Sequence, residues 1–124
     1  MIAADTSSLV AYFAGAKGKD VDLLELALET CSLILPPVVL SELLSDATMP
    51  ANLKHNLLLM PLIPVLEGYW ARAGHIRSIL VTNKLKARLA DTLIAQSCID
   101  AKVALITRDD DFRHFASYCK LTIA

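Results

Sequence analysis

The chain has 124 residues, of which 55% are hydrophobic and 20% charged, and its formal net charge is −1. This length predicts one domain over residues 1–124, and the near-zero charge excludes a general electrostatic attraction of the whole surface to nucleic acid. The longest apolar runs, about eight to ten residues, are too short for a membrane span, and no signal peptide is recognisable, so a cytoplasmic protein is expected.

In the first half of the chain, short apolar runs alternate with segments of helical periodicity. Asp20 is suited to cap one of these helices, and Pro37 is suited to begin the next. The predicted elements are a strand over Met1–Ala4, helices over Thr6–Ala16 and Val21–Thr30, a strand over Ser32–Leu35 and a helix over Val38–Leu44.

The second half continues this alternation, and Pro64 restricts its first strand to a sheet edge. The predicted elements are helices over Asn52–Leu59, Glu67–Thr82 and Ala90–Ala101, strands over Leu62–Leu66, Val103–Thr107 and Leu121–Ile123, and a short helical turn over Asp111–Phe115. Strands that alternate with helices favour right-handed crossovers and parallel pairing. We therefore predict a three-layer α/β domain, with a mostly parallel, twisted sheet of about four to five short strands flanked by helices.

The mean hydropathy of +0.49 is high for so small a domain. Two explanations stay open: a sheet that is apolar on both faces between helices, or a second buried surface at a dimer or partner interface. Trp70 falls on the apolar stripe of its predicted helix. We expect it in the core or at a dimer interface rather than stacked on a base.

Four acidic residues stand at the ends of apolar runs or near the starts of helices: Asp5, Glu42, Asp91 and Asp109. Because ligands bind at the carboxyl ends of the strands of a parallel α/β sheet, we expect these side chains to converge at one edge. Each has a structural alternative: Asp5 and Asp91 could cap helices, and Glu42 could lie on a solvated helix face. Asp111 could cap the next helical turn or complete the site in place of Asp109.

Two further acids are expected to stay outside the site. Asp100 lies about 180° round an ideal helix from Asp91, so the two cannot serve one site, and Asp100 is predicted to be plain surface. Asp110 is predicted to face solvent.

Carboxylates that converge without a matching base favour a divalent cation. Two of them about 4 Å apart repel each other by roughly 4 kcal/mol at an effective dielectric constant of about 20. Mg²⁺ or Mn²⁺ is the expected ion, because hard cations select oxygen ligands and no histidine or cysteine pair shows ligand spacing. The cysteine thiols are expected to be buried. The three histidines and three cysteines are isolated in the sequence: His55, His75, His114, Cys31, Cys98 and Cys119.

Four segments together resemble the PIN-domain ribonucleases, and more narrowly the VapC-type toxins of bacterial toxin–antitoxin pairs. The resemblance runs over nearly the whole chain, in order and at fitting separations. The segments are Asp5-Thr6-Ser7-Ser8-Leu9, Ser41-Glu42-Leu43, Asp91-Thr92-Leu93-Ile94-Ala95 and Thr107-Arg108-Asp109-Asp110-Asp111-Phe112.

This resemblance implies a PIN-like fold and a metal-dependent endoribonuclease. Asp5 and Asp91 would be the firm metal ligands, and Glu42 and Asp109 would complete the quartet directly or through bound water. Thr107 or Ser7 would orient these ligands by hydrogen bonds. The resemblance also implies cleavage of single-stranded or loop RNA, a homodimer, and inhibition by a small antitoxin protein.

Basic residues stand beside the acids in the sequence. Lys86 and Arg88 precede Asp91, and Arg108 directly precedes Asp109. Cations next to a metal site could hold RNA phosphates that the acids would otherwise repel, so these three are candidate RNA contacts. The alternative for each is an ordinary solvated charge.

Two other functions are compatible with a small α/β domain. A signalling receiver or haloacid-type phosphatase also carries acids at its sheet edge, but Ser7 stands where the phosphatase pattern places a second aspartate. A non-catalytic partner-binding module is favoured by the apolar content. Phosphodonor labelling would support the first, and the absence of stabilisation by metal would support the second.

Overall fold

A computed structural model describes residues 1–124 and contains a parallel sheet of three short strands in the order β2-β1-β3. The central strand β1 (Ile2–Ala4) pairs with β2 (Leu33–Ile34) on one side and with β3 (Leu105–Ile106) on the other. The predicted α/β class and the parallel pairing are confirmed, whereas the sheet has fewer strands than expected.

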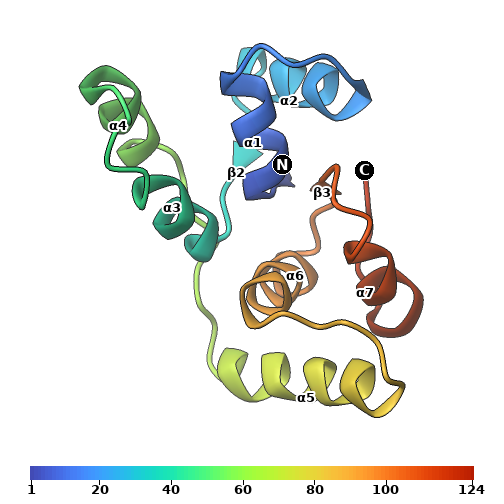
Figure 1. Ribbon diagram of the computed structural model, residues 1–124. Helices are drawn as coiled ribbons and strands as arrows, with labels where there is room; N and C mark the ends of the chain where they lie inside the picture. The colour runs from blue at the N-terminus through green and yellow to red at the C-terminus, as the bar shows by residue number, and fades with distance from the viewer.

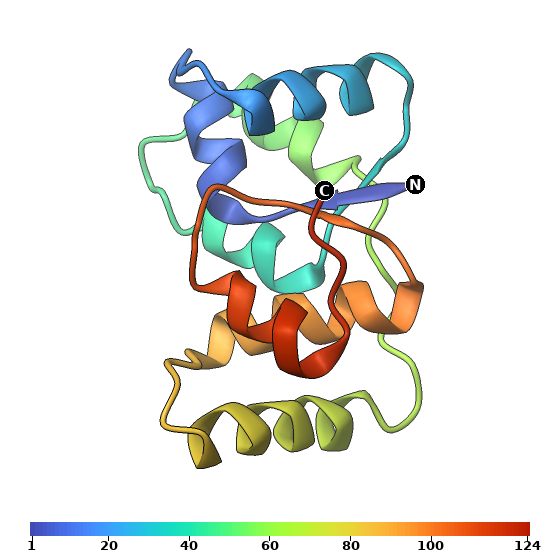
Figure 2. The ribbon, with the colours of Figure 1, turned by 90° about the vertical axis from the view of Figure 1, so that its right-hand side faces the viewer.

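Seven helices surround this sheet: α1 (Thr6–Phe13), α2 (Lys19–Glu29), α3 (Pro37–Leu44), α4 (Ala51–Leu58), α5 (Tyr69–Thr82), α6 (Leu89–Ala101) and α7 (Phe112–Cys119). Figure 1 shows their arrangement along the chain, from α1 near the N-terminus to α7 near the C-terminus. Figure 2 shows α1 and α2 on one side of the sheet and α6 and α7 on the other, with α5 outside these two. None of the helices combines the length and the apolar character that a membrane crossing requires.

The hydrophobic core is built around two alanines of the central strand. Ala3 and Ala4 are completely buried, and their small side chains leave room for larger ones from both helical layers. Leu24 of α2 packs from one layer, and Phe112 and Phe115 of α7 from the other. Because β1 is buried on both faces, its sequence is apolar without alternation, as expected for a central parallel strand.

Two predicted strands are reduced to single bridges. The stretch Leu62–Leu66 pairs with the sheet only where Leu62 faces Leu35, since Pro64 has no N–H with which to extend the ladder. Leu121–Ile123 likewise forms one bridge, between Ile123 and Leu105. These two bridges account for the difference between the predicted four to five strands and the observed three.

The structure also corrects several local predictions. Asp20 is not the N-cap of α2, because Gly18 holds that position and Asp20 lies in the first turn. The helical turn predicted at Asp111–Phe115 is a longer helix, which buries Phe112, Phe115 and Cys119 on one face.

The exposure of three side chains decides or corrects their predictions. Trp70 is 67% exposed, which excludes the core and leaves the dimer interface as the predicted alternative. Cys31 is exposed, although a buried thiol was expected, whereas the other two thiols are buried. Asp100 is not plain surface: its side chain is 8% exposed and pairs with Arg72 of α5 at 2.7 Å. The α5–α6 contact that creates this pair is tertiary and leaves no mark in the local sequence.

Candidate metal centre

The acids named from the sequence come from four different elements that meet at one edge of the sheet. Asp5 directly follows β1, and Asp109 follows the neighbouring parallel strand β3. Glu42 lies in α3, and Asp91 lies in the first turn of α6. Because parallel strands end at the same edge, the topology brings the first and the last of these residues together.

Asp5 is buried to 2% exposure and is held by three neighbours. Its Oδ1 accepts the backbone N–H of Ser8 at 3.0 Å, so Asp5 is indeed the N-cap of α1. The hydroxyl of Ser7 lies 2.9 Å and 2.8 Å from the two carboxylate oxygens, and Thr107 donates to Oδ2 at 2.6 Å. The side chain of Asp5 therefore caps α1 and also lies beside the candidate site.

Burial determines the protonation behaviour of Asp5. It raises the pKa of Asp5, while the hydrogen bonds from Thr107, Ser8 and Ser7 act in the opposite direction. The negative charge of Asp109 raises the pKa further, which shows that the two strand-end acids interact electrostatically.

A relay of hydrogen bonds leads from Asp5 to the segment that follows β3. Thr107 donates to Asp5, and its hydroxyl oxygen accepts the backbone N–H of Asp109 at 3.0 Å. Asp109 Oδ1 in turn accepts the N–H of Asp111 at 2.9 Å. Asp111 holds the N-cap position of α7, but its side chain caps no N–H and is available to the site.

Three carboxylates gather most closely, those of Asp91, Asp109 and Asp111. One oxygen from each lies within 4.8 Å of the others, and we call these three residues the acidic cluster. Burial raises the pKa of Asp91 to about 6, and the charge of Asp109 adds to this shift. Three mutually repelling oxygen donors with no thiolate or imidazole among them suit a hard divalent cation.

Glu42 lies at the rim of the acidic cluster. Its side chain is exposed, and its Oε1 accepts the hydroxyl of Thr6 at 2.7 Å, which links α3 to the start of α1. The charge of Glu42 contributes to the raised pKa of Asp91. Glu42 therefore lies on a solvated helix face, but it is bonded to Thr6 and its charge acts on Asp91.

Asp91 does not cap its helix. Arg88 holds the N-cap position of α6, and Asp91 follows in the first turn with no capping hydrogen bond. Its carboxylate is half-buried and faces other acids; the charge of Arg88 offsets only part of their repulsion, and Asp91 forms no ion pair. This is the arrangement that a bound cation would relieve.

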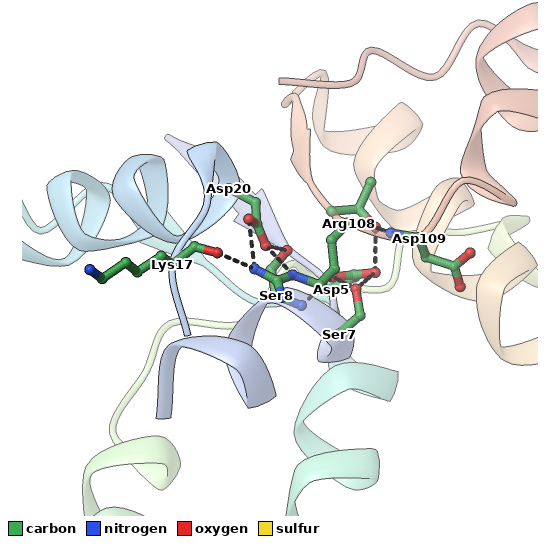
Figure 3. A network of polar contacts seen from close by, with 8 residues as sticks. Asp5, Ser7, Ser8, Lys17, Asp20, Arg108 and Asp109 are labelled. Atoms are coloured by element: carbon green, nitrogen blue, oxygen red, sulfur yellow. Dashed lines mark hydrogen bonds and ion pairs between the residues drawn. The ribbon is translucent and has the colours of Figure 1, made fainter. Parts of the chain in front are cut away.

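The three basic candidates take different positions. Lys86 lies beside the acidic cluster, with its ammonium nitrogen 3.0 Å from Asp111 Oδ2, and this contact lowers the pKa of Asp111. Arg88 is exposed at the start of α6. Arg108 instead turns toward α2 and pairs with Asp20, as Figure 3 shows.

The structure adds three residues to the surroundings of the site for which no role there was predicted: Thr6, Ser8 and Asp20. Ser8 could have been found, because an N-cap aspartate is expected to bond the N–H three residues later. Asp20 could not, since its partner Arg108 is 88 positions away in the chain.

Comparisons with known proteins place this geometry in a wider context. The family model described as "PIN domain" matches residues 2–118. A search among curated proteins finds no match.

Three solved structures share the fold at 20% sequence identity. VapBC2 from Rickettsia felis, bound to a promoter DNA fragment, has a TM-score of 0.75 and covers 100% of this chain and 98% of its own. VapBC-5 from Mycobacterium tuberculosis has a TM-score of 0.67, with coverages of 98% and 95%. FitAcB from Neisseria gonorrhoeae has a TM-score of 0.71, with coverages of 99% and 96%.

Proposed function

The chain belongs to the PIN domain family, and from this premise we propose that it is a Mg²⁺- or Mn²⁺-dependent endoribonuclease that acts as the toxin of a toxin–antitoxin pair. The observation that carries the proposal is the convergence of Asp91, Asp109 and Asp111 within 4.8 Å. These acids come from the first turn of α6 and from the segment that follows β3, and none of them forms an ion pair with an arginine. Their mutual repulsion costs stability, which a bound cation would restore.

In this proposal the acidic cluster holds the cation, with Asp5 and Glu42 beside it. The ion would polarise the scissile phosphodiester and lower the pKa of an attacking water. Thr107 and Ser7 keep the Asp5 carboxylate fixed by donating to its oxygens. Hydrogen-bond donors that hold a carboxylate in this way preserve its orientation when the cation and the substrate exchange.

RNA would be held against this negative site by nearby cations. Lys86 contacts Asp111 and is 51% exposed, so its ammonium group can also reach a phosphate in solution. Arg88 is exposed at the start of the helix that carries Asp91. Together they would offset the repulsion between the acids and the RNA backbone.

In this proposal, the antitoxin partner binds an apolar surface of the chain. An apolar cavity of about 350 Å³ lies between α1, α2 and α4 and is lined by Leu9, Phe13, Leu28 and Leu57. A second cavity of about 380 Å³ shares Phe13 and extends to Glu42. The structurally similar VapBC-5 is a member of a family of toxin–antitoxin systems, and an apolar partner segment along these cavities would end beside the acids.

A second copy of the chain is the proposed neighbour of another surface. Val65, Leu66 and Trp70 lie close together in sequence, and each is at least 47% exposed. Exposed apolar residues that together form one patch commonly mark an interaction surface. A homodimer that covers them would also account for the high mean hydropathy.

Cleavage of RNA by the purified chain tests the proposed function. With Mg²⁺ or Mn²⁺ we expect new RNA ends at defined positions, and with a chelator we expect none. Asp91→Asn should reduce the cleavage rate by on the order of a thousandfold, since one main electrostatic contribution is lost.

Asp110→Asn is the matched control, because Asp110 is an exposed neighbour outside the acidic cluster. It should cleave at the parental rate. Parental cleavage by Asp91→Asn, or cleavage that survives the chelator, would show that the proposed chemistry is wrong.

A non-catalytic binding module is the second candidate, favoured by the same exposed apolar groups. A metal titration distinguishes the two. A metalloenzyme should gain about 2.7 kcal/mol of unfolding free energy at a hundred times the dissociation constant of Mn²⁺. A binding module without a metal site should gain nothing.

A further inference from the structure

A closed ring of hydrogen bonds joins Asp5 to a second aspartate, Asp20 of α2 (Figure 3). On one side, Ser8 donates its backbone N–H to Asp5 Oδ1 at 3.0 Å and its hydroxyl to Asp20 Oδ2 at 2.9 Å. On the other side, Arg108 donates Nε to Asp20 Oδ2 at 2.8 Å and Nη2 to Asp20 Oδ1 at 3.0 Å. The ring closes through the backbone to Thr107, whose hydroxyl donates to Asp5 Oδ2 at 2.6 Å.

Arg108 occupies a particular place in this ring, between two residues of the candidate site. Thr107 donates to Asp5, and Asp109 belongs to the acidic cluster. Figure 3 shows Asp109 extending away from the side on which Arg108 meets Asp20. The Arg108 side chain therefore points toward α2, while Thr107 and Asp109 on either side of it face the acids.

The ion pair is stable across the neutral pH range. The Arg108 guanidinium lowers the pKa of Asp20 to about 2, so this carboxylate remains charged. The Asp20 side chain is 12% exposed, and Ser8 is completely buried. A bidentate arginine–carboxylate contact adds directional constraint to the electrostatic attraction.

The backbone before α2 is shaped to admit this pair. A Cβ at Gly18 would lie 2.7 Å from Asp20 Oδ1 and 3.1 Å from Arg108 Nη2. Any larger residue there would have to displace the carboxylate from the ring. The lack of a side chain at Gly18 therefore leaves room for the ion pair between Asp20 and Arg108.

We propose that Asp20 is a positioning residue for the candidate metal site. Through Ser8 it fixes Asp5, and through Arg108 it fixes the segment from Thr107 to Asp109, so that the acids following β1 and β3 keep their relative placement. This inference rests on the proposed function, because it assigns Asp20 to the same metal site. Outer partners of this kind support metal ligands without touching the ion.

Calorimetric titration of Mn²⁺ into the full-length chain, without RNA, tests the inference. Asp20→Asn should bind Mn²⁺ about tenfold more weakly than the parent, as is typical when an outer partner of a metal ligand is removed. Ser8→Ala removes only the hydroxyl link and should show a smaller loss in the same direction. The double variant Asp20→Asn/Arg108→Gln should bind no more weakly than Asp20→Asn, since both changes open the same ring.

The pair Arg72–Asp100 supplies a matched control, because it is also bidentate and similarly exposed but lies between α5 and α6. Asp100→Asn should lower thermal stability and leave Mn²⁺ affinity unchanged. Parental Mn²⁺ affinity in Asp20→Asn and Ser8→Ala, or an equal loss in Asp100→Asn, would overturn the positioning role.

Cleavage kinetics separate positioning from direct contact with RNA. At saturating Mn²⁺, Asp20→Asn and Arg108→Gln should both keep the parental KM for RNA. A raised KM in Arg108→Gln alone would assign the arginine to RNA and contradict the inference. A parent that binds no Mn²⁺ would overturn the proposed function together with this inference, whereas a binding parent with unaffected variants would overturn the inference only.

Discussion

Two groups of aspartates in this protein differ in how their charge is compensated. In the acidic cluster, Asp91 faces other acids and has no ion-pair partner, and the only ion pair is that of Lys86 with Asp111. Asp20 and Asp100, in contrast, are each held by an arginine in bidentate contact. The comparison teaches that surplus negative charge, rather than the number of acids, marks the candidate metal site.

The largest expected effect is an opposite change in stability when one member of each group is neutralised. In metal-free solution, Asp100→Asn should lower the free energy of unfolding by about 1–2 kcal/mol, because Arg72 and Gln96 lose a charged partner. Asp91→Asn should raise it, because like-charge repulsion is relieved. Thermal unfolding in chelator measures both, and a fall in both variants would remove the distinction.

An intermediate effect is expected in the pH dependence of stability. The pKa of Asp91 is raised from 3.8 to about 6, so between these values the folded state holds a proton that the unfolded state has lost. Metal-free stability should therefore fall as the pH rises from about 4 to about 6. Urea unfolding at a series of pH values should show this decline in the parent and a weaker one in Asp91→Asn.

In the same experiment, the contribution of Asp20 to stability should change with pH in the opposite direction. Its pKa is lowered from 3.8 to about 2, so the stability from its ion pair is present above about pH 4 and lost as the pH falls toward about 2. Asp20→Asn should remove that acid-side loss and leave the decline between about pH 4 and pH 6 in place. Identical profiles for the two variants would contradict the assignment of the two groups.

The smallest effect concerns the one cation in contact with the acidic cluster. Lys86→Gln should raise the KM for RNA a few-fold and reduce the slope of log affinity against log salt by about 1, because one phosphate contact is lost. Lys84→Gln, a change at an exposed lysine without an ion pair, is the control and should leave both quantities unchanged. Cleavage assays at several salt concentrations measure them.

Much of the site could be predicted from the sequence because strand ends carry positional information. Asp5 and Asp109 follow apolar runs, and parallel pairing of those runs was enough to place them at one edge. The structure confirms that pairing, β1 with β3, and brings Asp91 beside Asp109. The choice between Asp109 and Asp111 was left open, and both belong to the acidic cluster.

The features that could not be predicted depend on contacts between distant side chains. The ion pair of Asp20 with Arg108 and that of Asp100 with Arg72 join helices and loops whose local sequence is equally compatible with solvent-exposed charges. The missing strand at Leu62–Leu66 has a local cause, since Pro64 removes a donor, but the remaining single bridge depends on Leu35 of another segment.

The chain order of the sheet has a kinetic consequence. Strand β1, which precedes β2 and β3 in the sequence, is the central one, and the hydroxyl that completes the surroundings of Asp5 comes from a residue 102 positions later. Closing so long a loop has an entropic cost, so it is slow compared with forming the helices. During refolding, helical content should therefore recover before Mn²⁺ binding, because the edge that carries the acidic cluster stays unfinished until β3 docks.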